Sequence, residues 1–145
     1  MPTPIDQLRQ LVDGTRPPPP IAALIGFTLT TVSPGEAVIE LATSRQHANP
    51  MGALHGGVLC DIADAAMGIA YASTLAEGET FATIELKINF LKPVWNAKLR
   101  AFGRLVKRGK TMGFVECDIT DDQESLVARA SSTCMTLHEE QAHGR

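Results

Sequence analysis

The sequence predicts a single α+β domain in which an antiparallel sheet wraps around one long central helix. One apolar run, between residues 53 and 75, is long enough for such a helix and is rich in Ala and Gly. Period-two alternation of apolar and polar residues dominates from residue 83 to residue 137. The chain lacks the alternation of strands and helices that a doubly wound parallel sheet requires. A helix that is apolar nearly all round is expected where a curved sheet covers it.

The N-terminal part predicts a short helix followed by a connector. Residues 4–14 carry Ile5, Leu8 and Leu11 at helical spacing, and Gly14 ends the run. The four prolines at 17–20 predict an extended segment. We therefore divide the chain into an N-terminal helix with its Pro-rich connector (1–23), a main domain (24–138) and a frayed tail (139–145).

The strands are predicted from alternation and turn residues. Two β-rich runs lie between Leu24 and Thr43, and the loop 44–52 leads into the central helix. The segment 83–90 alternates strictly, which predicts one covered and one polar face. Its covered face would carry Ile84, Leu86, Ile88 and Phe90, and its polar face Thr83, Glu85, Lys87 and Asn89. Further strands are expected at 98–106, 115–120 and 126–137, with a hairpin turn at Gly109.

Composition excludes several classes of protein. A net charge of −3 disfavours a dedicated nucleic-acid binder. We find no secretory signal and no apolar span long enough for a membrane helix, since Asp61 and Asp64 interrupt the longest run. The three cysteines are too widely spaced for a zinc site, no other metal-ligand spacing occurs, and we expect buried, unreactive thiols. A cytoplasmic protein is the expectation.

The most informative segment is the turn His55-Gly56-Gly57 with Asp64 in the helix that follows it. A carboxylate among apolar residues is costly to bury, so its retention indicates a use. The unpaired amides at the start of a helix suit a negatively charged oxygen. An acid together with such amides predicts acyl-transfer chemistry.

Several motifs together resemble the PaaI-like group of hotdog-fold acyl-CoA thioesterases, over a match from about Leu24 to Leu137. They are Asn49-Pro50, His55-Gly56-Gly57, the acid nine residues after that His, Asn89-Phe90-Leu91-Lys92-Pro93 and Gly109-Lys110-Thr111. The resemblance implies a hotdog fold and hydrolysis of an acyl-CoA, with water as co-substrate and no cofactor besides the CoA moiety of the substrate. It also implies a dimer, or a dimer of dimers.

The resemblance implies a role for each residue around the turn. Asp64 would attack the thioester carbon or activate a water, and the Gly56 N–H would stabilise the oxyanion. Asn49, His55 and Thr83 would position the reactants. The structural alternatives are an Asx turn for Asn49, support of the turn for His55 and an ordinary strand residue for Thr83.

Substrate contacts are expected at two further places. Glu85 and Phe90 would line the CoA channel, although Phe90 could equally be core. The cations around the β-hairpin would meet the CoA phosphates, with Arg104 as a further candidate, unless this is a solvated turn. The residues concerned are Lys107, Arg108, Gly109, Lys110 and Thr111.

The spacing of Gly56 and Asp64 predicts a dimer. Eight residues of helix separate them by ~12 Å, too far to serve one thioester. Two antiparallel helices would bring Gly56 of one subunit to Asp64 of the other, and a homotetramer is the expected assembly. Asp61, one turn earlier, would either raise the pKa of Asp64 or form a structural bond across the dimer.

The acyl group stays open between aryl, such as phenylacetyl, and medium-chain types. A non-catalytic acyl-CoA binder and a hotdog hydratase or dehydratase are the alternative functions.

Overall fold

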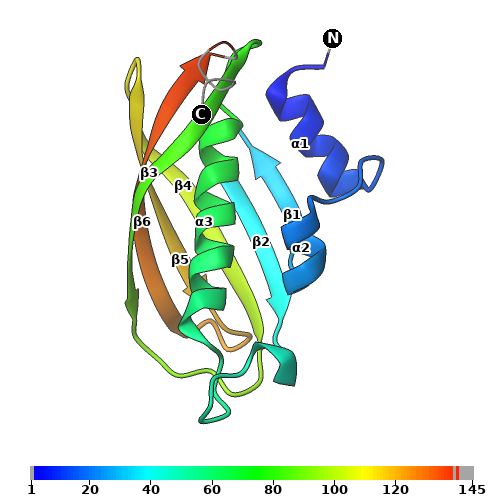
Figure 1. The fold of residues 1–145 in the computed structure, drawn as a ribbon, viewed down its shortest axis with the longest axis vertical. Helices are drawn as coiled ribbons and strands as arrows, with labels where there is room; N and C mark the ends of the chain where they lie inside the picture. Colours follow the sequence, from blue (N-terminus) through cyan, green and yellow to red (C-terminus); the bar gives the residue numbers. More distant parts are fainter. Residues whose placement is uncertain (1, 139, 141–145) are drawn as a thin grey trace.

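A computed structural model describes residues 2–138 and 140, and its centre is a six-stranded antiparallel sheet that curves around one helix (Figure 1). The strand order is β1-β2-β4-β5-β6-β3, so β1 and β3 are the two edges. This arrangement confirms the predicted fold class. The elements are α1 (Pro4–Asp13), α2 (Pro20–Ile25), β1 (Thr28–Ser33), β2 (Glu36–Ala42), a 3₁₀ turn (Arg45–His47), α3 (Gly56–Ala72), β3 (Glu79–Phe90), β4 (Lys98–Arg108), β5 (Met112–Thr120) and β6 (Leu126–His138).

The central helix α3 packs closely on the sheet because both surfaces are built from small residues. On the sheet-facing side of α3, the small residues Ala63, Ala66 and Ala70 are fully buried, as is Ile62. A Cβ at Gly103 of β4 would overlap the backbone of Ala66, so the approach requires a glycine there. The face of α3 turned away from the sheet, which carries Asp64, is the more exposed one.

The N-terminal segment follows the prediction for α1 and departs from it at the prolines. Thr3 caps α1, and Gly14 ends it with φ 81°. Pro20 is not part of an extended connector, because it begins α2, and Leu24 lies in that helix rather than in a strand. Proline suits the first turn of a helix, where its missing N–H has no acceptor to lose. The extended part is therefore Pro17–Pro19.

A β-bulge in β3 corrects the predicted faces of that strand. Thr83 pairs with Cys134, and Glu85 pairs with the adjacent Thr133, so Ile84 is an extra residue. The bulge reverses the alternation. Thr83 consequently shares the helix-facing side with Leu86 and Ile88, whereas Ile84 is 49% exposed.

The cysteines are buried as predicted in the sheet but not in the helix. Cys117 and Cys134 are fully buried, and burial raises the pKa of Cys117 to about 12. Cys60 is only half-buried, because it lies one turn before Asp64 on the more exposed side of α3. The predicted tail, 139–145, lies outside the described residues apart from Glu140. No helix in the described ranges is long and apolar enough to cross a membrane.

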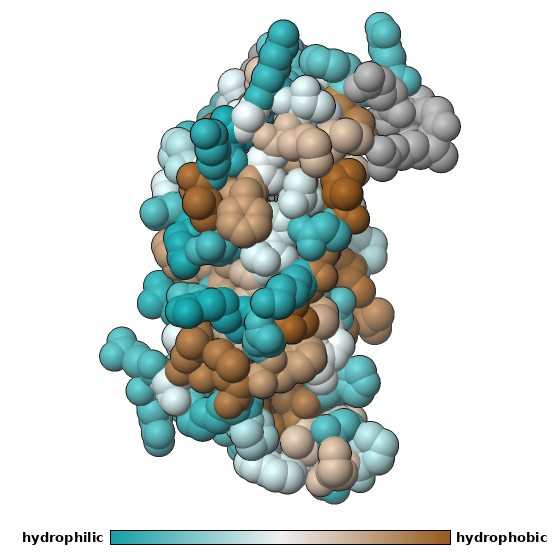
Figure 2. Space-filling model, turned by 90° about the vertical axis from the view of Figure 1, so that its left-hand side faces the viewer, coloured by the Kyte–Doolittle hydropathy of each residue, from teal (hydrophilic) through white to brown (hydrophobic). Residues whose placement is uncertain are grey.

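The outer face of the sheet, opposite α3, is mixed in character. Figure 2 shows hydrophobic groups on this side of the molecule separated by bands of hydrophilic side chains. The exposed apolar residues of β3, β4 and β5 include Ile84, Val106, Met112 and Phe114.

Candidate active site

Asp64 lies in the middle of α3 beside the edge strand β3. Its carboxylate accepts a hydrogen bond of 3.3 Å from the Thr83 hydroxyl. Partial burial raises the pKa of Asp64, the Thr83 hydrogen bond opposes this shift, and the nearby charge of Asp61 adds to it. Asp64 is nevertheless an exposed residue, and it lines a cleft with a volume of about 540 Å³. A raised pKa and access to a cleft are typical of a catalytic carboxylate.

The helix start contains an amide that is free to bind an oxyanion. His55 is the N-cap of α3, and its Nδ1 accepts a hydrogen bond of 2.8 Å from the Gly57 N–H. The Gly56 N–H has no acceptor among residues 2–138 and 140. Since Nδ1 is an acceptor, the neutral ring carries its proton on Nε2, where it can donate outwards. His55 therefore shapes the turn and keeps one donor available.

The ring of Phe90 covers Gly56. A Cβ built on Gly56 would lie 2.9 Å from the Phe90 ring. Phe90 is 55% exposed, so it is not a core residue, and that alternative is wrong. A glycine at this position lets the ring and the open amide lie side by side.

Asn49 forms the turn that precedes the site. Its Oδ1 accepts hydrogen bonds from the N–H groups of Met51 (2.9 Å) and Ala53 (3.1 Å). The side chain thus adopts the Asx-turn arrangement. These bonds use the oxygen and leave the amide nitrogen as the group available to a ligand.

The other predicted residues are more distant from Asp64. Glu85 pairs with Thr133 on the outer face of the sheet, so within this chain it lies on the opposite side from α3. The hairpin between β4 and β5 lies at the C-terminal end of α3, because the Arg108 guanidinium is 4.9 Å from the centre of the Tyr71 ring. Gly56 is at the other end of the helix. The predicted residues therefore form two groups in one chain.

The hairpin cations differ in their availability. Arg108 packs on Tyr71 and approaches Glu79 at 3.9 Å, so its charge is already partnered. Lys107 and Lys110 are exposed and form no ion pair with the described residues. The Gly109 N–H donates to the Met112 carbonyl across the hairpin, and the Thr111 carbonyl accepts from the Thr136 N–H. The two lysines are the free charges here.

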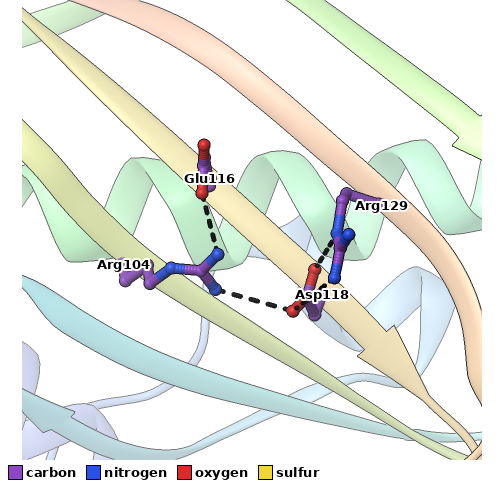
Figure 3. A network of polar contacts seen from close by, with 4 residues as sticks. All are labelled: Arg104, Glu116, Asp118 and Arg129. Carbon is purple, nitrogen blue, oxygen red and sulfur yellow. Dashed lines mark hydrogen bonds and ion pairs between the residues drawn. The ribbon is translucent and has the colours of Figure 1, made fainter.

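Arg104 is not part of this group of cations. Its guanidinium donates to Glu116 at 2.8 Å and approaches Asp118 at 3.6 Å, while Arg129 bonds the same Asp118 (Figure 3). The four side chains lie on the sheet face opposite α3 and neutralise one another. The expectation that Arg104 adds to the phosphate patch is wrong for this reason.

The sequence alone did not indicate the cleft beside Asp64. Leu8 and Leu11 of α1 and the prolines at 17–19 form one wall, and Ala65 and Gly68 of α3 form another. The helical spacing of Leu8 and Leu11 was visible, but not the surface that they face.

Within the described ranges, no three His, Cys, Asp or Glu side chains gather as a metal site would require.

Comparisons with known proteins identify the family of this chain. Residues 51–128 match the family model of the thioesterase superfamily. A Saccharolobus solfataricus protein with a provisional esterase name is 33% identical over 66% of this chain and 68% of its own length. The 1,4-dihydroxy-2-naphthoyl-CoA hydrolase of Listeria monocytogenes is 29% identical over 75% of this chain and 89% of its own length. Human acyl-coenzyme A thioesterase 13 is 26% identical over 74% of this chain and 77% of its own length.

Solved structures show the same fold. A Ralstonia eutropha protein described as related to phenylacetic acid degradation has a TM-score of 0.80 and 29% identity, over 88% of this chain and 97% of that one. E. coli PaaI has a TM-score of 0.80 and 24% identity, over 89% of this chain and 92% of its own. With half of the chain matched by one family model and its fold shared with PaaI proteins, the chain belongs to the thioesterase superfamily as a PaaI-like hotdog protein, a family of thioester hydrolases.

Proposed function

We propose that this protein hydrolyses an acyl-CoA thioester at a site formed by two subunits. Asp64 of one subunit acts as the general base or nucleophile, and the Gly56 N–H of the partner subunit stabilises the oxyanion. The observation that carries the proposal is the position of Asp64, which lines an apolar cleft, accepts from Thr83 and has a raised pKa. A structural acid on a helix gains nothing from such surroundings.

The cross-subunit arrangement follows from the helix and from the sheet edge. Gly56 and Asp64 belong to the same straight element, α3, and eight residues separate them by ~12 Å. The edge strand β3 carries no further strand on its outer side among the described residues. Pairing of two β3 strands about a two-fold axis would extend the sheet and run the two α3 helices antiparallel. Each Thr83–Asp64 pair then lies close to the dimer axis.

The remaining residues have supporting roles in this proposal. The Asn49 amide nitrogen and the His55 Nε2–H donate to the attacking water or to the thioester. Thr83 holds the Asp64 carboxylate, and Phe90 lies beside the oxyanion amide. Tyr71 is ~10 Å along α3 from Asp64, so the hairpin extends beyond the acid and away from Gly56 of the same chain. Lys107 and Lys110 would bind the CoA phosphates there. A soluble cytoplasmic homotetramer is the setting we propose.

Hydrolysis of a panel of acyl-CoAs, followed by release of free thiol, tests the proposal. We expect turnover by the native protein and a fall in kcat of about 10²–10⁴ for Asp64→Asn, the usual contribution of a general base. Asp61→Asn is the matched control, and we expect less than about a tenfold change. Tight binding of acyl-CoA without turnover would instead support a binding protein. Hydration or dehydration with an intact thioester would support the alternative enzyme.

A further inference from the structure

The cleft beside Asp64 is larger than a packing defect. Its volume of about 540 Å³ falls within the range of roughly 300–1,000 Å³ that is usual for small-molecule sites. Natural cores contain few voids larger than a water molecule. Phe27 and Ile39, both buried, line it together with residues of α1, Pro17–Pro19 and α2.

The helix α1 covers this cleft without filling it. Its apolar side carries Ile5, Leu8 and Leu11, yet no residue of α1 is buried. Leu8 and Leu11 instead line the cavity. Apolar side chains that face a gap forgo the dispersion contacts of a packed interior. An apolar occupant would complete the burial of this helix face.

The chemistry of the lining limits what the occupant can be. Of the lining residues that the structure describes, only Arg16 and Asp64 are charged, and Thr28 supplies the one hydroxyl. Hydroxyl groups on a bound ring would therefore find few partners, and each unpaired buried polar group costs ~1–3 kcal/mol. The opposite wall on α3 consists of small residues, among them Ala65, Gly68 and Ala72. The lining is therefore almost wholly apolar, which suits a plain hydrocarbon chain.

We propose that the cleft lined by α1, Pro17–Pro19 and the outer face of α3 holds the hydrocarbon chain of a linear aliphatic acyl-CoA, and that α1 sets the chain length accepted. This rests on the proposed function, since Asp64 belongs to the lining and its carboxylate must meet the thioester carbon. The acyl chain then begins at Asp64 and continues beneath α1. Residues of α1 and the connector lie outside the region matched by the family model, residues 51–128.

The experiment fills the cavity from two sides. Ala65→Leu adds volume from α3, and Ile21→Trp adds it from α2, whereas Ala23→Leu on the exposed side of α2 is the matched control. We expect the ratio of kcat/KM for dodecanoyl-CoA to that for butanoyl-CoA to fall at least ~10-fold in either filled variant, the discrimination that one or two methylenes give in an apolar pocket. The control should keep the native ratio.

A second readout does not depend on turnover. S-dodecyl-CoA, a thioether that cannot be hydrolysed, should raise the Tm of the native protein and of Ala23→Leu, and raise that of the filled variants much less. If the native protein turns over thioesters but both filled variants keep the native ratio, the cavity is not the acyl site and the proposed function stands. If no thioester is hydrolysed, the proposed function fails, and the thioether decides whether the cavity binds a chain. Equal stabilisation of all variants by the thioether would overturn the proposal that the cleft holds the acyl chain.

Discussion

At the scale of single residues, the environment of Asp64 combines effects of opposite sign. Partial burial and the charge of Asp61 raise the pKa of this carboxyl, and the hydrogen bond from Thr83 lowers it. A base must be ionised to act, so we expect activity to fall as the pH drops through this raised pKa. The acid limb of the profile should therefore lie at a pH above 3.8, the ordinary pKa of an aspartate.

Two substitutions should move that limb in opposite directions. Thr83→Val removes a hydrogen bond that favours the charged form, so the pKa of Asp64 should rise and the limb should move to higher pH. Asp61→Asn removes a like charge, so the limb should move to lower pH. Profiles of kcat/KM against pH for the three proteins measure this. Shifts of the same sign in both variants would contradict the assignment of the limb to Asp64.

The same raised pKa predicts a stability effect. Below the unfolded-state pKa the protonated carboxyl costs nothing, and as the pH rises through the raised folded-state pKa the ionised group disfavours the fold. Asp64→Asn should therefore raise the Tm at neutral pH, and the gain should vanish in acid.

Asp118 should show the opposite effect on stability, because the hydrogen bond from Arg129 holds its pKa low. Asp118→Asn should lower the Tm at neutral pH. Thermal unfolding at several pH values compares the two, and a lowered Tm for Asp64→Asn at neutral pH would refute this view.

At the scale of elements, the start of α3 depends on a histidine acting as N-cap. The His55 Nδ1 accepts the Gly57 N–H, a role usually taken by Ser, Thr, Asp or Asn. His55→Ala should cost about 1 kcal/mol in the free energy of unfolding, while His55→Asn should retain most of the stability. Urea denaturation measures both. If His55 also donates to the substrate, His55→Asn should lose activity while it keeps the fold, and equal stability losses in the two variants would disprove the capping role.

The predictability of each element followed its local signal. The alternation along most of β4, β5 and β6 and the apolar run of α3 are strong local signals, and these elements were predicted from them. The helix α2 was missed because a proline run also suits an extended segment, and only the first turn of a helix accepts Pro20. The bulge at Ile84 was invisible because strict alternation hides one extra residue. Its consequence reaches the site, since it turns Thr83 towards Asp64.

Other parts of the site were beyond any sequence pattern. The spacing of His55, Gly56 and Asp64 indicated both the helix start and the acid. By contrast, the position of Phe90 on Gly56 joins the start of α3 to the end of β3, and only the register of the sheet sets it. The partners of Arg104 likewise come from cross-strand pairing, with Glu116 directly opposite on β5.

At the scale of the whole molecule, the length of α3 decides how many chains make one site. If Asp64 and the Gly56 N–H act on the same thioester, they come from different subunits, and two defective chains should repair each other. Asp64→Asn removes the acid, and Gly56→Pro removes the N–H at a helix position where proline is tolerated. Each variant alone should form inactive dimers. A mixed dimer would combine the Asp64 of one chain with the Gly56 of the other in one intact site.

Equal amounts of the two variants, unfolded together and refolded, should regain about a quarter of the native activity. Half of the dimers would be mixed, and one of the two sites in each would be intact. Each variant refolded alone is the control, and circular dichroism shows whether Gly56→Pro keeps its fold beside the Phe90 ring, which a side chain at this position must displace. A mixture as inactive as its components, from variants that fold and dimerise, would mean that the acid and the amide act within one chain. The ~12 Å of helix between them makes that outcome incompatible with the proposed chemistry.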